Sequence, residues 1–138
     1  KQMADTVTGP EVLQENDKRV VLKIVVESDG DGSTTVFFDS SARLVNGAAS
    51  LGTLQRIWYS CSPGDGSDSF ARLDFEDSDG DRPLLGLTGA AYWDFREFGG
   101  LPPSTDANTN GDINFVVAAA ADAGNMYTAI AEFIKTPT

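Results

Sequence analysis

The chain has no histidine and only one cysteine, Cys61, among its 138 residues. Without histidine it can hold neither a Ser-His-Asp nor a Cys-His catalytic group, and it offers no imidazole to a metal. A single cysteine forms no disulfide within the chain and cannot build a four-cysteine zinc site. A nucleophilic Cys61 would need another activating group, and the sequence shows none. These absences predict a protein that is not an enzyme, carries no cofactor and has no metal site.

Basic residues are also scarce. Ten lysine and arginine residues stand against 21 aspartate and glutamate residues, which gives a formal net charge of -11. Nucleic-acid phosphates need a cationic surface, so we expect no nucleic-acid partner. We also expect no membrane partner, because an anionic membrane would repel the chain and no run of about 18 apolar residues is present. The acidic excess is compatible with solubility, a high-salt habitat or a basic partner surface.

The length fits one domain, and hydrophobic residues make up 41% of it, enough for a core. Short β-branched runs alternate with Gly/Asp turns, which predicts an all-β fold: an antiparallel β-sandwich, with a jelly roll as one form of it. We expect a single sandwich domain over residues 18–138. The expected strands are Arg19–Glu27, Thr34–Asp39, Leu54–Cys61, Phe70–Phe75, Pro83–Leu87, Ala91–Phe98, Asp112–Ala121 and Met126–Lys135.

Two parts of this assignment have alternatives. The last two strands are expected to form a C-terminal hairpin, although the alanine run Ala118–Ala121 also allows a helix. Residues 1–17 are predicted to be an irregular N-terminal arm, because their apolar residues are sparse and Gly9-Pro10 interrupts any strand. Such an arm would become ordered against a neighbouring molecule. The alternative is an edge strand of the same domain.

Aspartate-rich loops are the first candidates for chemistry. Asp106, Asn108, Asn110 and Gly111 have the spacing of the first half of an EF-hand loop, but Val117 stands where a bidentate glutamate is required. The segments 77–82 and 29–34 repeat the spacing without the necessary glycine. We interpret all three as turns.

Aromatic residues are the second candidates, and they concentrate in two segments. In Tyr92–Phe98, strand alternation places Tyr92 on one face and Trp93 on the other. Trp58 and Tyr59 also point to opposite faces, so at least one of them is expected in the core. Exposed members could stack on sugars or anchor a protein interface. The candidate partner-binding residues are Trp58, Tyr92, Trp93, Phe95, Arg96 and Phe98.

Four segments carry a resemblance to a known group of proteins: VVLKIVVESDGDG (20–32), RIWYSCS (56–62), YWDFREFGG (92–100) and NGDINF (110–115). They resemble small structural proteins of tailed bacteriophages, many of which infect marine bacteria. The resemblance implies a capsid decoration or cement protein, made in the host cytoplasm and bound to the outer surface of the virion. Its partners would be the major capsid protein, neighbouring copies of itself, or both, and analogy suggests a homotrimer.

Two other functions remain open at this point. The aromatic residues on a sheet scaffold also suit a carbohydrate-binding or tail-associated adhesion module. A hydrolase that uses clustered carboxylates would need two acids facing each other across a cleft.

Overall fold

A computed structural model describes residues 5–29, 32–62, 71–104, 108–117 and 125–137 of the chain. These residues form nine strands: β1 (Thr6–Glu15), β2 (Arg19–Glu27), β3 (Ser33–Phe38), β4 (Ser50–Ser62), β5 (Ala71–Asp77), β6 (Arg82–Leu87), β7 (Ala90–Asp94), β8 (Thr109–Val117) and β9 (Met126–Pro137). The only helix among them is the short 3-10 turn η1 (Arg96–Phe98). The predicted all-β fold is confirmed.

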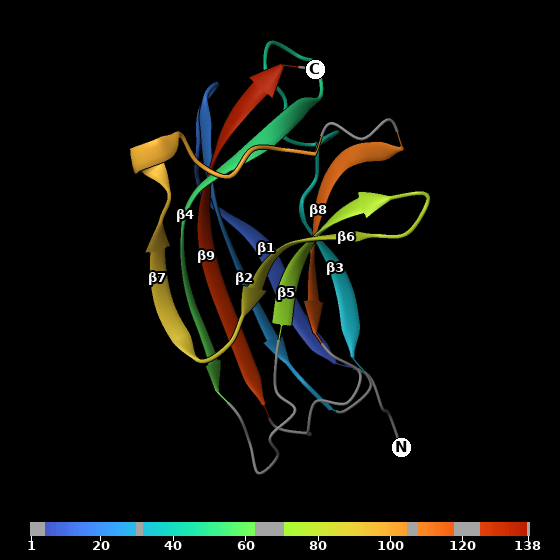
Figure 1. The fold of residues 1–138 in the computed structure, drawn as a ribbon, viewed down its shortest axis with the longest axis vertical. Helices are drawn as coiled ribbons and strands as arrows, with labels where there is room; N and C mark the ends of the chain where they lie inside the picture. Colours follow the sequence, from blue (N-terminus) through green and yellow to red (C-terminus); the bar gives the residue numbers. More distant parts are fainter. Residues whose placement is uncertain (1–4, 30–31, 63–70, 105–107, 118–124, 138) are drawn as a thin grey trace.

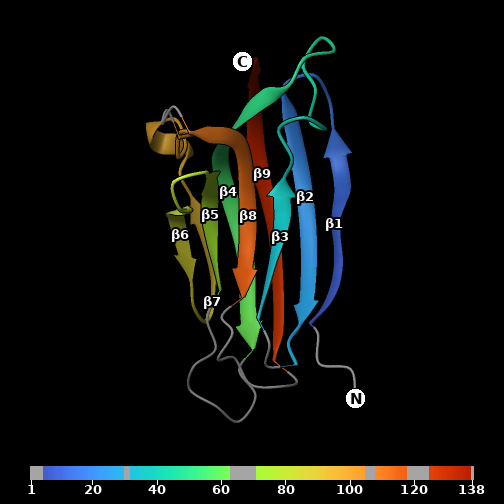
Figure 2. The ribbon, with the colours of Figure 1, turned by 90° about the vertical axis from the view of Figure 1, so that its right-hand side faces the viewer.

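The strands form two antiparallel sheets. The five-stranded sheet has the order β1-β2-β9-β4-β7, and the four-stranded sheet has the order β3-β8-β5-β6. Figures 1 and 2 show these two layers from perpendicular directions, with β1, β2 and β9 in one layer and β3 and β8 in the other. The predicted antiparallel β-sandwich is therefore present.

The strand pairing is nested. β2 pairs with β9, β3 with β8, β4 with β7 and β5 with β6. The chain from β2 to β9 is thus one long antiparallel hairpin, with its tip at the β5–β6 turn, folded over into two sheets. Pairing of β4 with β9 and of β5 with β8 completes the sheets. Eight strands arranged in this way form a jelly roll, and β1 is added outside β2.

The core lies between the sheets and follows the side-chain alternation of the strands. In β2, Val20, Leu22, Ile24 and Val26 are at most 2% exposed, while the residues between them face outward. Aromatic rings from both sheets meet in the middle, where Phe133 of β9 contacts Phe37 and Phe38 of β3. Two sheets with one apolar face each bury those faces by packing on one another.

The prediction of an irregular N-terminal arm is wrong for residues 6–15, which form β1. This strand pairs with β2 along its whole length, with register shifts between Thr8 and Glu11 and between Val12 and Gln14. The first register shift accommodates Gly9-Pro10, which would interrupt a regular strand. Gly9 has a φ of +106°, and a Cβ there would lie 2.7 Å from the Lys23 carbonyl oxygen. Without β1, the outer edge of β2 would expose a row of backbone N–H and C=O groups that have no hydrogen-bond partners. β1 supplies those partners. The boundary expected at residue 17 therefore does not separate an arm from the sandwich.

The predicted C-terminal hairpin is also wrong. β8 pairs with β3 and β5 in one sheet, whereas β9 pairs with β2 and β4 in the other. Consecutive strands cross between the sheets because the whole chain is folded as one nested hairpin. The alanine run 118–121 lies outside the described residues. Among the residues that the structure does describe, none lies in a helix with the length and apolar character needed to cross a membrane.

Candidate interaction surface

The outer face of the five-stranded sheet carries an exposed aromatic pair. Trp58 of β4 lies opposite Tyr92 of β7 on one side and opposite Ile130 of β9 on the other. Directly opposed residues project from the same face of a sheet, so these three side chains are neighbours. Trp58 is 39% exposed and Tyr92 is 45% exposed. The core is on the other face, so these rings are free to meet a partner.

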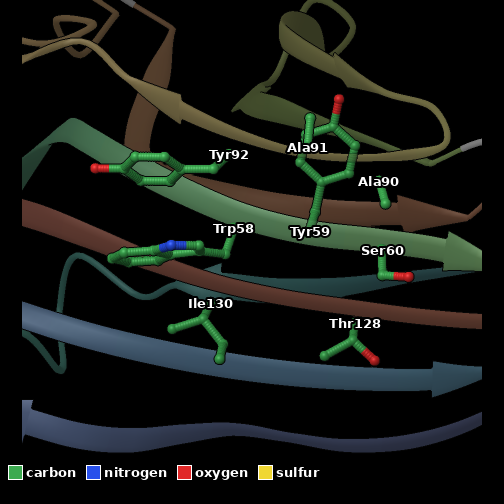
Figure 3. Close-up of a pocket in the computed structure, with 8 residues that line it drawn as sticks. All are labelled: Trp58, Tyr59, Ser60, Ala90, Ala91, Tyr92, Thr128 and Ile130. Atoms are coloured by element: carbon green, nitrogen blue, oxygen red, sulfur yellow. The ribbon is translucent and has the colours of Figure 1, made fainter.

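The two rings stack on each other. Their centroids are 4.8 Å apart and their planes differ by 19°. Figure 3 shows both rings nearly edge-on, with Ile130 next to Trp58 and with Thr128 farther along β9, next to Ser60. Because each ring presents a face to the other, the pair does not form a flat platform directed at solvent.

An ion-pair network continues from Trp58 across the sheet. The guanidinium carbon of Arg56 lies 5.0 Å from the centroid of the Trp58 ring, in range for a cation–π contact. The Nε of Arg56 donates to Glu132 Oε1 at 2.9 Å, and Arg19 lies 3.7 Å from the same carboxylate. Glu132 is only 7% exposed, so arginine charges compensate a largely buried carboxylate. This network places the Arg56 guanidinium against the Trp58 ring.

Two shallow hollows flank Trp58. One, of about 460 Å³, is lined by Trp58, Tyr92, Ile130 and their neighbours on β4, β7 and β9. The other, of about 510 Å³, is lined by Val21, Arg56, Trp58, Ile130 and Glu132. We call the surface formed by Val21, Arg56, Trp58, Tyr92, Ile130 and Glu132 the aromatic face.

The remaining candidate residues lie elsewhere, around the end of β7 and η1. The indole Nε1 of Trp93 donates to Tyr59 Oη at 3.1 Å, and its ring is parallel to that of Phe95, with centroids 6.5 Å apart. Phe95 is 9% exposed and belongs to the core, so a partner cannot reach it, whereas Phe98 is 66% exposed. Arg96 is bound to the neighbouring Asp94 through two of its nitrogens. The six candidates therefore divide into the Trp58–Tyr92 pair and this second group.

Sequence alternation found part of the aromatic face. Strict alternation along β4 puts Arg56 and Trp58 on one side, as observed, but it would also put Leu54 there. Leu54 is fully buried because the β4–β9 register shifts at Gln55, which moves the outward-facing residues by one position. The sequence alone does not single out Ile130 as a surface residue of this face, because a lone isoleucine in a strand has no distinguishing pattern until its cross-strand neighbours are known.

The Cys61 thiol and the acidic side chains are the remaining groups that could carry chemistry. Cys61 is 5% exposed, and burial raises the pKa of its thiol to about 11. Within the described residues, no group of three or more aspartate, glutamate or cysteine side chains is placed to hold a metal ion. Asp106, the first residue of the predicted EF-hand-like spacing, lies outside those residues.

Comparison with known proteins adds no relative. No protein-family model, no curated protein and no solved structure matches this chain.

Proposed function

We propose that this chain is a non-enzymatic structural protein of a bacteriophage particle. It would act as a decoration protein that binds the outer surface of the capsid through the aromatic face. The observation that carries the proposal is the exposed Trp58–Tyr92 pair, fixed beside Arg56. Tryptophan, tyrosine and arginine are the residues that most often dominate the energetics of protein–protein interfaces.

Three features support a protein surface as the partner. The Arg56–Glu132 network places the guanidinium against Trp58 before any partner arrives, so little side-chain entropy of Arg56 would be lost on docking. Ile130 and Val21 surround it with apolar area, and the hollows beside it can receive protruding side chains. The jelly roll is used by viral capsid proteins, although a fold by itself does not define a function. The segments 56–62 and 92–100, on which the resemblance to phage structural proteins rests, contain Arg56, Trp58 and Tyr92.

Decoration also suits a small acidic module. Many copies on a lattice act together even where each contact is weak, so one compact docking face is sufficient. The major capsid protein and neighbouring copies of the chain are the partners that we propose, with the chain located on the virion surface.

The second candidate is a carbohydrate-binding module. In its favour, the hollow between Val21 and Glu132 combines an apolar floor with a charged pair that could hydrogen-bond sugar hydroxyls. Against it, Trp58 and Tyr92 stack on each other, so the two rings do not form a flat, solvent-facing platform on which a sugar ring could stack. Protein docking therefore explains more of the geometry.

The test begins with mass spectrometry of purified particles of the phage that encodes the chain. A copy number close to that of the major capsid protein supports decoration, a few copies per particle indicate a tail or neck position, and absence refutes both. Rebinding to particles stripped of the protein then tests the surface. Trp58→Ala should weaken binding by about 30-fold or more, as expected for a central interface residue.

The matched control is Phe98→Ala, which removes an exposed aromatic ring outside the aromatic face. Its affinity should stay within about threefold of the natural chain. If Trp58→Ala also stays within about threefold of the natural chain, the docking surface lies elsewhere. Binding of the natural chain to defined glycans on an array, abolished by Trp58→Ala, would favour the second candidate.

A further inference from the structure

Strand β7 forms a free edge of the five-stranded sheet. It is the last strand in the order β1-β2-β9-β4-β7, and Figure 1 shows it at the left margin of the molecule with β4 on its inner side. Beside one end of β7 the Gly89 carbonyl accepts from the N–H of Cys61 at 2.7 Å. Beside the other end the N–H of Phe95 donates to the Gln55 carbonyl at 2.8 Å. Successive residues of a strand direct their backbone groups to opposite sides, so the even-numbered residues of β7 direct theirs at the free edge. These residues are Ala90, Tyr92 and Asp94.

The other three edge strands carry features that oppose further pairing, and β7 does not. β1 contains Pro10 and has two register shifts against β2, while β6 contains Pro83 and pairs with β5 through one shift. β3 has one shift against β8. Prolines and bulges at sheet edges hinder the joining of two edges. β7 has neither, because its five residues pair with β4 in unbroken register. Its edge can therefore accept another strand.

The side chains along β7 leave this edge apolar and without net charge. Tyr92 and Trp93 are 45% and 49% exposed. Trp58, on β4, covers one face of the Tyr92 ring, so the opposite ring face is directed at the free edge. Asp94 is the only charged residue of the strand, and Arg96 pairs with it at 2.6 Å. Two copies of a chain with a net charge of -11 repel each other, and this edge lets them meet without opposing like charges.

The order of small and large residues in β7, AAYWD, suits pairing with a second copy of itself. Antiparallel pairing centred on Tyr92 places Ala90 opposite Asp94 of the second copy. It also places Ala91 opposite Trp93 of the second copy, so each larger side chain meets an alanine. The two Tyr92 residues form the central hydrogen-bonded pair, with Cα atoms about 5.5 Å apart, and their free ring faces can stack. We propose that two copies of the chain join through β7 about a twofold axis, which makes one continuous sheet of their five-stranded sheets.

A contact of this kind closes on itself, because both copies use the same surface and no β7 edge is left for a third. It buries the edge of the sheet and leaves the outer face open. In a clause that rests on the proposed function, a dimer would dock on the capsid with two aromatic faces at once, which strengthens weak binding. The contact itself is short, so we expect a dissociation constant on the order of 10⁻⁵–10⁻⁴ M for the dimer.

The first test uses the isolated full chain at concentrations from about 10 μM to about 1 mM. Sedimentation velocity should show a monomer–dimer equilibrium over this range. Hydrogen exchange identifies the surface, because the N–H groups of Ala90, Tyr92 and Asp94 face solvent in one copy and are hydrogen-bonded in the dimer. We expect exchange at these three positions to slow as the concentration rises, while exchange in β1 stays the same.

The second test compares two substitutions at one position. Tyr92→Pro and Tyr92→Val both remove the ring, but only proline also removes the N–H that is directed at the free edge. That N–H takes no part in pairing with β4, so Tyr92→Pro should fold, and its far-UV circular dichroism spectrum checks this. We expect Tyr92→Pro to dimerise at least about tenfold more weakly than Tyr92→Val, since the two central hydrogen bonds are lost.

Three results would overturn the proposal. One is a chain that stays monomeric up to about 1 mM. Another is a dimer in which exchange of the β7 amides does not slow, because a different surface then joins the copies. The third is equal dimerisation of Tyr92→Pro and Tyr92→Val; if the proline variant does not fold, hydrogen exchange of the natural chain decides. No capsid is present in these experiments, so their failure is separate from a failure of docking through the aromatic face.

Discussion

A buried ion pair joins the N-terminal strand to the body of the sandwich, and it allows a quantitative test of that strand's role. The side chain of Lys135, on β9, is 2% exposed. Its ammonium donates to Glu15 Oε2 at 3.0 Å and to the carbonyl of Leu44 at 3.1 Å. Glu15, the last residue of β1, also pairs with Arg43 at 2.9 Å.

The perturbation is Glu15→Gln, which removes the carboxylate and leaves the ammonium buried. Loss of one partner from a buried pair costs about 3–5 kcal/mol. Glu15 is 28% exposed, so water screens part of the interaction, and we expect a loss of about 2 kcal/mol. For a domain of this length that corresponds to a fall in Tm of roughly 6–10 °C. Urea unfolding followed by circular dichroism measures the change in the free energy of unfolding.

Two further variants separate the causes. Glu11→Gln removes an exposed carboxylate from the same strand, opposite Lys23, and should change stability by less than about 0.5 kcal/mol. Glu15→Gln combined with Lys135→Met replaces both charges and should recover most of the loss, since no charge is then buried alone. If Glu15→Gln changes stability as little as Glu11→Gln does, the Glu15–Lys135 contact does not anchor β1.

Three other outcomes are expected. Cys61 should react with a thiol reagent at pH 8 only as fast as the chain unfolds, because the thiol is buried and its pKa is raised to about 11; rapid labelling of the native protein would contradict this. Gly100→Ala should cost about 2 kcal/mol in urea unfolding, since φ is +94° and a Cβ would lie 2.8 Å from the Leu54 carbonyl oxygen. Gly99→Ala, which also has a positive φ but open space around it, is the control and should cost less. Hydrogen bonds from Arg96 hold the pKa of Asp94 well below its usual range, so this carboxylate stabilises the fold above about pH 4 and loses that contribution as the pH falls toward its folded pKa. Asp94→Asn should therefore lose less stability than the natural chain between about pH 4 and pH 2, and an unchanged pH profile would show that the pair is irrelevant to folding.

The sequence by itself determined where most strands lie. Arg19–Glu27 was predicted with the bounds that β2 has, because alternating valine, isoleucine and leucine residues report the two faces of a strand directly. Alternation also separated Trp58 from Tyr59, and the structure places the first on the surface and the second in the core. Two members of the aromatic face, Trp58 and Tyr92, were identified for the same local reason.

Only the tertiary structure decided how the strands pair, since backbone hydrogen bonds do not depend on which side chains the strands carry. The nested hairpin sends β8 and β9 to different sheets, although a short connection joins them in the sequence. Neither the bulge at Gln55 nor the pairing of β1 with β2 has a local signal, because each depends on the strand that lies alongside. The same holds for the stack of Trp58 on Tyr92: the two rings come from different strands, and the fold brings them together.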